Sequence, residues 1–141
     1  MTSSGGVSWA ARDASPQAHS PKPAAATVNL FGYYVLITGL GLVLMPSRVL
    51  GLFGLPPATD GWVRVLGSLA VVVGYYYIRC AHANDRHFFR ASVHGRFLFA
   101  GLTVLLVVAF GAPWQLLLFG AMDVLGALWT RHALVHGDDV A

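Results

Sequence analysis

Residues 93–130 read VHGRFLFAGLTVLLVVAFGAPWQLLLFGAMDVLGALWT, and this stretch decides the fold. It holds two apolar runs, 93–110 and 113–130, which are separated only by a glycine and an alanine. Each run approaches the length of about 20 residues that a helix needs to cross a bilayer. Because Gly111 and Pro113 favour a tight turn, we expect two antiparallel neighbouring helices.

Two further apolar runs, 28–45 and 62–78, precede this pair. The chain of 141 residues is 56% hydrophobic and 11% charged, and it contains no glutamate. Soluble domains carry about a quarter charged residues, so too few ionic groups are present for a water-facing surface. The sequence therefore predicts an all-α fold, an integral membrane four-helix bundle. Residues 46–55, between the first two runs, are expected to form a short interfacial helix.

The regions outside the four runs are polar or rich in small residues. Residues 1–27 are rich in Ser, Ala, Gly and Pro, which predicts a disordered cytoplasmic tail. The transmembrane domain is predicted to cover 28–132, and a polar C-terminal tail to cover 133–141. The small residues of 24–26 come before the first apolar run, whereas a signal peptide has them after it, so this run is expected to remain as an anchor.

The distribution of basic residues predicts the orientation. Seven of them fall on the side shared by both termini, against two, Arg48 and Arg64, on the other. Because Lys and Arg accumulate in cytoplasmic loops, both termini are predicted to be cytoplasmic. Since the basic residues are spread between apolar runs, no nucleic-acid partner is expected. The residues expected to contact lipid headgroups are Arg79, Arg86 and Arg90, from a segment in which basic residues recur at helical spacing.

Small residues are expected on the faces where helices meet. Helices in lipid associate through close packing at small side chains, because the lipid tails are as apolar as the helices themselves. In the first two runs, pairs of glycines lie seven residues apart and so share one helical face. The glycines predicted to pack helices together are Gly32, Gly39, Gly67, Gly74, Gly120 and Gly126.

Asp123 is the only carboxylate within an apolar run. A charge at that depth must pair with a cation, bind a proton or face water. Arg96, on the neighbouring helix, is its best-placed partner, whereas Arg64 starts near the opposite surface. Tyr75 can add a hydrogen bond. The group has two interpretations: an ion pair that fixes helix packing, which we favour, or a site that holds a ligand.

The remaining polar residues carry no catalytic motif. His132 and His136 are spaced for zinc, but Ala133 stands where a zinc protease has glutamate. Haem ligation by His94 with a second histidine is an alternative that the sequence leaves open. Cys80 is the only cysteine and is expected to fill apolar space. We therefore expect no bound metal or cofactor, and a role other than catalysis.

Scattered positions across about 28–135 carry a resemblance. They are Trp62, Arg64, Gly67, Gly74, Tyr75, Tyr76, Phe89, Gly95, Arg96, Asp123, Gly126, Ala127, Trp129 and Thr130. In these positions the chain resembles the small four-span bacterial membrane proteins of the DoxX-like group. The resemblance implies a four-helix bundle, located in the inner membrane of a bacterium, and carries over no catalytic residue.

Two functions are compatible with these features. The chain has loops too short for a soluble domain, and its glycine stripes favour helix contacts. We therefore expect an interaction or accessory subunit in the lipid bilayer, bound to another membrane protein or to copies of itself. The alternative is a binder or carrier of a small hydrophobic or protonatable ligand, held by Asp123 and Arg96.

Overall fold

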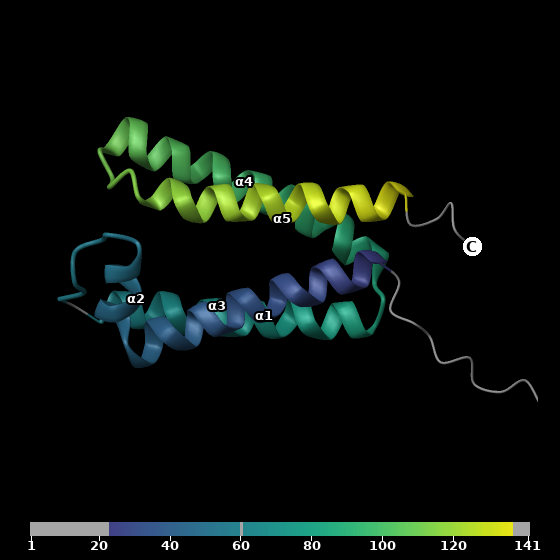
Figure 1. Cartoon of the computed structure of the whole chain (residues 1–141), viewed down its shortest axis with the longest axis horizontal. Coiled ribbons are helices and arrows are strands. Elements are labelled where there is room, and N and C mark those ends of the chain that lie inside the picture. Colours follow the sequence, from purple (N-terminus) through teal and green to yellow (C-terminus); the bar gives the residue numbers. More distant parts are fainter. Residues whose placement is uncertain (1–22, 60, 137–141) are drawn as a thin grey trace, which may run out of the picture.

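The computed structural model describes residues 23–59 and 61–136. Within these ranges the chain is helical, without strands (Figure 1). The helices are α1 (Pro23–Leu44), α2 (Pro46–Leu52), α3 (Trp62–His82), α4 (Arg86–Phe110) and α5 (Leu116–His136). The all-α prediction is therefore confirmed for the described residues.

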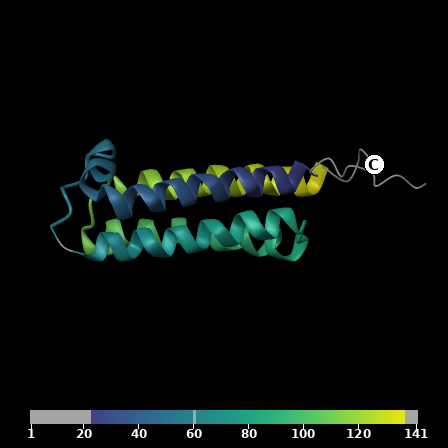
Figure 2. The same ribbon diagram turned by 90° about the horizontal axis from the view of Figure 1, so that it is seen from below.

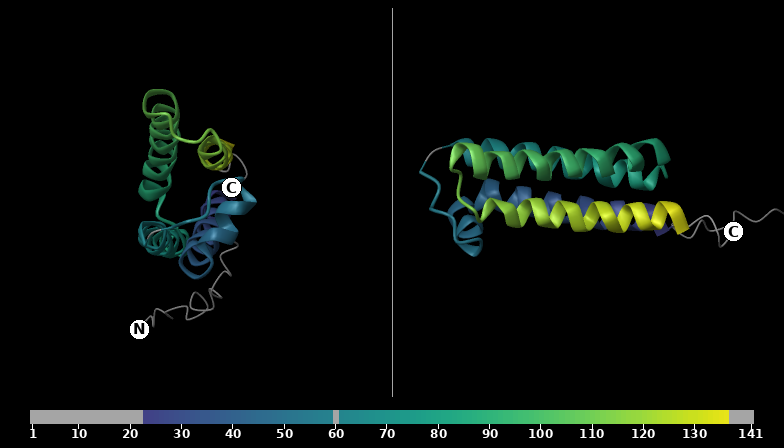
Figure 3. Two further views of the ribbon diagram at one scale, coloured as in Figure 1. Left: turned by 90° about the vertical axis from the view of Figure 1, so that its left-hand side faces the viewer. Right: turned by 90° about the horizontal axis from the view of Figure 1, so that it is seen from above.

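The four long helices form two antiparallel hairpins. α1 packs along α3, and α4 packs along α5. The hairpins meet mainly where α1 contacts α5, whereas α3 and α4 share few contacts (Figure 3, left). The first residue of α1 and the last of α5 lie at one end of the molecule, beside the turn between α3 and α4 (Figure 2). The short helix α2 lies at the opposite end.

Three of the long helices are long and apolar enough to cross a membrane. They are α1, α3 and α4, with mean hydropathies of 1.7, 1.3 and 1.9. This result indicates a membrane location. α5 is not among them, and its sequence includes Asp123, Arg131 and His132, which lower its hydropathy. Four membrane spans were predicted, and three of the described helices are long and apolar enough to be such spans.

The helices are longer than the apolar runs that predict them. α1 begins at Pro23, so 23–27 is helical and not part of a disordered tail. Proline is tolerated in the first turn, where its missing N–H has no partner to lose. α5 begins at Leu116 rather than 113 and continues through 133–136, which was predicted as a tail. The predictions for 1–22 and 137–141 lie outside the described residues.

The α3–α4 turn interrupts the segment that was predicted to lie along the membrane as one helical face. Asn84 adopts a left-handed backbone conformation with φ of 52°. Asp85 then caps α4 because its side chain accepts hydrogen bonds from the backbone N–H groups of His87 and Phe88. Arg79 and Arg90 are exposed and Arg86 is half-buried, but they belong to two helices. The helical spacing across this segment therefore does not correspond to one face.

Glycines bring the backbones of α1 and α3 into contact. A Cβ atom added at Gly39 would lie 2.7 Å from the backbone nitrogen of Val71, and one at Gly74 would lie 2.7 Å from that of Leu36. Gly32 and Gly67 have similarly close neighbours on the opposite helix. Only residues without a side chain permit this separation.

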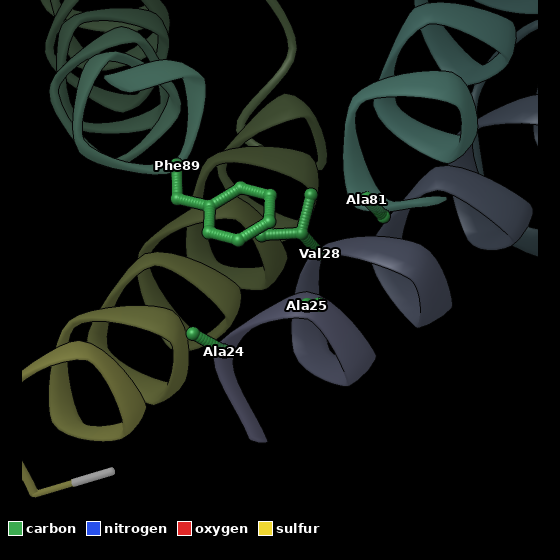
Figure 4. Close-up of a cluster of buried hydrophobic side chains, with 5 residues drawn as sticks. All are labelled: Ala24, Ala25, Val28, Ala81 and Phe89. Carbon is green, nitrogen blue, oxygen red and sulfur yellow. The ribbon is translucent and has the colours of Figure 1, made fainter. Parts of the chain in front are cut away.

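The described residues include one apolar core cluster, near the α3–α4 turn (Figure 4). Its buried members come from α1, α3 and α4, and they are Ala24, Ala25, Val28, Ala81 and Phe89. Ala133 and Leu134 of α5 pack against them. At the opposite end, Phe53 stacks on Phe119 with ring centroids 4.4 Å apart. The two hairpins are therefore joined at both ends.

Candidate functional site

Arg96 of α4 is the largest fully buried side chain of the described residues, with 2% of its surface exposed. Its guanidinium carbon lies 3.6 Å from the ring centroid of Phe31 on α1 and 5.1 Å from that of Tyr77 on α3. A guanidinium over an aromatic face is stabilised by the negative face of the ring. Arg96 thus connects α4 to both helices of the other hairpin.

A chain of hydroxyl groups continues from Arg96 across α5 to α1. The Arg96 Nη1 group donates a hydrogen bond to the Thr130 hydroxyl, at 3.3 Å. The Thr130 oxygen is also 3.2 Å from the Thr27 hydroxyl, which lies 2.8 Å from the carbonyl oxygen of Ala24. Thr27 and Thr130 are both buried. The guanidinium and two hydroxyls therefore link three helices in the interior.

Gly126 provides the space in which the guanidinium lies. A Cβ atom at this position would be 3.0 Å from Arg96 Nη1 and 3.0 Å from Phe31 Cδ2. Gly120, two turns earlier on α5, faces Ala100 and Thr103 of α4 at ordinary contact distance. All six glycines that were predicted to pack helices thus lie opposite a neighbouring helix, and Gly126 lies against the buried cation itself.

Two donors of Arg96 have no hydrogen-bond partner. Its Nε and Nη2 atoms are buried, and neither has a hydrogen-bond partner of good geometry in the part of the chain that the structure describes, although the Tyr77 hydroxyl interacts with the guanidinium electrostatically. A buried polar group without a partner costs about 1 to 3 kcal/mol, and more when it is charged. Such groups are rare in folded proteins, so each one calls for an explanation.

Asp123 lies within electrostatic range of Arg96 but not in direct contact with it. The guanidinium nitrogens are occupied by Thr130 or unpartnered, so no salt bridge joins the two residues. The geometry of helical side chains explains this. Arg96 extends toward the start of α4, and its guanidinium lies between the levels of Gly126 and Thr130, one to two turns along α5 from Asp123.

The other two residues of the predicted polar group lie elsewhere. Arg64 is exposed at the start of α3, and Tyr75 is exposed and packs on Tyr76 at a centroid distance of 5.9 Å. Arg64 lies in the first turn of α3, before the part of the helix that contacts α1, and Tyr75 lies about 100° around the helix from Gly74. Arg64 instead borders an open hollow of about 530 Å³ beside α2, together with Arg48.

The histidines do not form a metal centre among the described residues, which include no cluster of three or more metal-ligating side chains. His132 and His136 stack with centroids 4.2 Å apart. The exposed His94 ring has its Nδ1 atom 2.8 Å from the backbone oxygen of Arg90. Its position on the surface of α4 places it outside the Arg96 site.

Four residues of the site, Thr27, Phe31, Tyr77 and Thr130, were not predicted as site residues from the sequence. Phe31 and Tyr77 carry no polar signal, and Thr27 was assigned to the tail. A usable signal is present for α1, because Thr27 and Phe31 are four residues apart and therefore share a helical face. No local pattern distinguishes Tyr77 from the neighbouring Tyr75 and Tyr76.

Comparisons with protein-family models, with curated proteins and with solved structures found no match for this chain. The resemblance to the DoxX-like group therefore remains a prediction.

Proposed function

We propose that this chain is an integral membrane protein of the bacterial inner membrane in which all four long helices cross the bilayer. α5 has 21 residues, or about 30 Å at 1.5 Å per residue, which matches the hydrocarbon core. It runs antiparallel to α4, and its Thr130 is buried in the interior. The excess of basic residues at the α3–α4 turn supports cytoplasmic termini.

Cysteine labelling tests this topology. In a Cys80→Ala background, Thr59→Cys lies on the α2–α3 connection and Ala83→Cys on the α3–α4 turn, and both positions are exposed. A membrane-impermeant maleimide added to intact spheroplasts should label the first variant and not the second. If Ala83→Cys is labelled from outside and Thr59→Cys is protected, the orientation is the reverse of the one proposed. If both are labelled equally, the two positions lie on the same side of the membrane, and α3 does not cross it.

For its function, we propose an interaction or accessory subunit. The observation that carries this proposal is the open side between α3 and α4, which are joined by a short turn yet share few contacts. On α4, Gly101 is exposed and has open space where a Cβ atom would lie. Exposed small residues permit close approach of a further helix. The partner is a second copy of the chain or another membrane protein.

Purification in a mild detergent, followed by native mass spectrometry, tests this function. The wild-type protein should appear as an oligomer or with a stable partner. Gly101→Leu should weaken the complex, because the added side chain separates the helices. Ala121→Leu, an exposed small residue of α5, is the matched control and should leave it intact. A clean monomer, or equal complexes in both variants, would contradict the role of the α4 surface.

A second function is favoured by one specific observation, the two unpartnered donors of the buried Arg96. We propose that the interior binds a small ligand there, near Asp123. Charged residues inside membrane bundles commonly mark the sites and pathways of ligands. Binding of amphiphilic probes to the purified protein tests this function, and no binding of any probe would contradict it.

A further inference from the structure

The unpartnered donors of Arg96 lie on one edge of its guanidinium. Nη1 donates to Thr130, which leaves Nε and Nη2 free. In arginine these two nitrogens point their N–H groups in parallel, with the spacing of two oxygens of a carboxylate or phosphate. The free edge is therefore the bidentate one, whereas an isolated water molecule accepts only one such bond well.

The surroundings hold this edge in place. The guanidinium lies over Phe31 and near Tyr77, and Gly126 closes the third side. A planar group held by two rings and a hydrogen bond cannot turn toward Asp123 without losing these contacts. The positive charge thus remains without a direct counter-ion, at 2% exposure, where desolvation costs several kcal/mol.

In the proposed topology, the site lies near the level of the cytoplasmic lipid headgroups. Thr27 is four residues from the start of α1, or about 6 Å at 1.5 Å per residue, and Thr130 is six residues from the end of α5, or about 9 Å. An anionic group of an amphiphile resides near this depth when its chain extends into the hydrocarbon core. A small anion from the water can also reach it.

We propose that the Nε and Nη2 groups of Arg96 bind the carboxylate or phosphate of an anionic amphiphile through two parallel hydrogen bonds. This inference rests on the second proposed function, and it names the chemical class of the ligand. The anion supplies the missing counter-charge, and the aromatic rings of Phe31 and Tyr77 keep the guanidinium plane oriented.

The test uses the full chain, purified in an uncharged detergent. The amphiphilic probes are oleate, dioleoyl phosphatidic acid and oleyl alcohol, which has the same chain as oleate without the charge. Acetate and inorganic phosphate are the free anions. Binding is measured by native mass spectrometry and by the shift of the unfolding temperature. We expect oleate or the phosphatidic acid to bind at least tenfold more tightly than oleyl alcohol, because charge-assisted bonds contribute more than 1.4 kcal/mol, the value of a tenfold change.

Variants separate Arg96 from general basic charge. Arg96→Lys keeps the charge but loses the paired donors, so we expect binding of the anionic probe to weaken about tenfold or more. Arg64→Gln removes an exposed charge and should leave binding unchanged. If Arg96→Lys does not fold, the comparison of oleate with oleyl alcohol in the wild-type protein still tests whether the ligand must be an anion.

The outcomes distinguish the two proposals. Equal binding of oleate and oleyl alcohol would overturn the anionic class while leaving a ligand-binding function. No binding of any probe would overturn both. If acetate or phosphate raises the unfolding temperature as much as the amphiphiles do, the site binds an oxyanion, but the proposal that the anion belongs to an amphiphile is overturned. Loss of binding in Arg64→Gln rather than in Arg96→Lys would move the site to the surface.

Discussion

The glycine contact between α1 and α3 predicts a specific loss of stability in Gly74→Ala. The new Cβ atom would lie 2.7 Å from the backbone nitrogen of Leu36 and 2.9 Å from the backbone oxygen of Gly32, where ordinary contact begins at 3.4 Å. Because backbone atoms cannot rotate away, the helices must separate locally by about 0.7 Å, and a gap of this size forfeits a quarter to a half of a dispersion contact. Overpacking of this kind costs about 1 to 3 kcal/mol.

Gly95→Ala is the matched control. Gly95 is also within a long helix, but nothing lies within 4 Å of the position of its Cβ atom. Both variants gain the same helix propensity from alanine, about 1 kcal/mol, so their difference isolates the clash. Thermal unfolding in detergent should place Gly74→Ala below Gly95→Ala by about 2 to 4 °C for each kcal/mol. If both variants unfold at the same temperature, the two backbones are not in contact.

Three further predictions concern the polar interior. Asp123→Asn should leave the protein folded but less heat-stable, and adding Arg96→Gln should partly restore the unfolding temperature. If the effects of the two substitutions on the unfolding free energy simply add, the two residues are not coupled. Thr130→Val removes the acceptor of Arg96 and should cost about 1 to 3 kcal/mol of unfolding free energy, whereas Thr103→Val, whose hydroxyl bonds only within its own helix, should cost less. Phe31→Leu should cost about 1 to 2 kcal/mol through the lost guanidinium contact, and an unchanged unfolding temperature would exclude it.

The helices could be predicted from the sequence because their determinants are local. Apolar runs mark their centres, and the turn at Gly111, which has a φ of 64°, is fixed by a residue that tolerates that conformation. The ends were placed less well. Pro23 and the small residues after it were interpreted as a tail because a segment rich in proline and small residues predicts disorder, yet Ala24 and Ala25 are buried by residues from α3 and α4. That burial depends on contacts distant in sequence.

The site could be predicted only in part, because helical periodicity places a residue on a face but does not set the level its side chain reaches. Arg96 was predicted to belong to the polar group around Asp123, and the structure buries it. Its pairing with Asp123 was inferred from the adjacency of two helices, and the structure places the guanidinium nearer Thr130. The role of Tyr77 depends on how the two hairpins meet, which no local pattern in the sequence specifies.

The position of Arg96 links the stability of the fold to the proposed binding of an anion. Its guanidinium contacts α1, α3 and α5 at the junction of the two hairpins, so an anion that pairs with it stabilises the same junction. A ligand that binds only the folded state raises the free energy of unfolding, by about 2.7 kcal/mol when its concentration is a hundred times its Kd. The chain should therefore be least stable when stripped of anionic amphiphiles, and the hairpins should separate before either one unfolds, because each hairpin retains its own packed interface. Hydrogen exchange on the stripped protein would then show early exposure of α1 residues near Thr27, while the Gly39 and Gly67 contact remains protected.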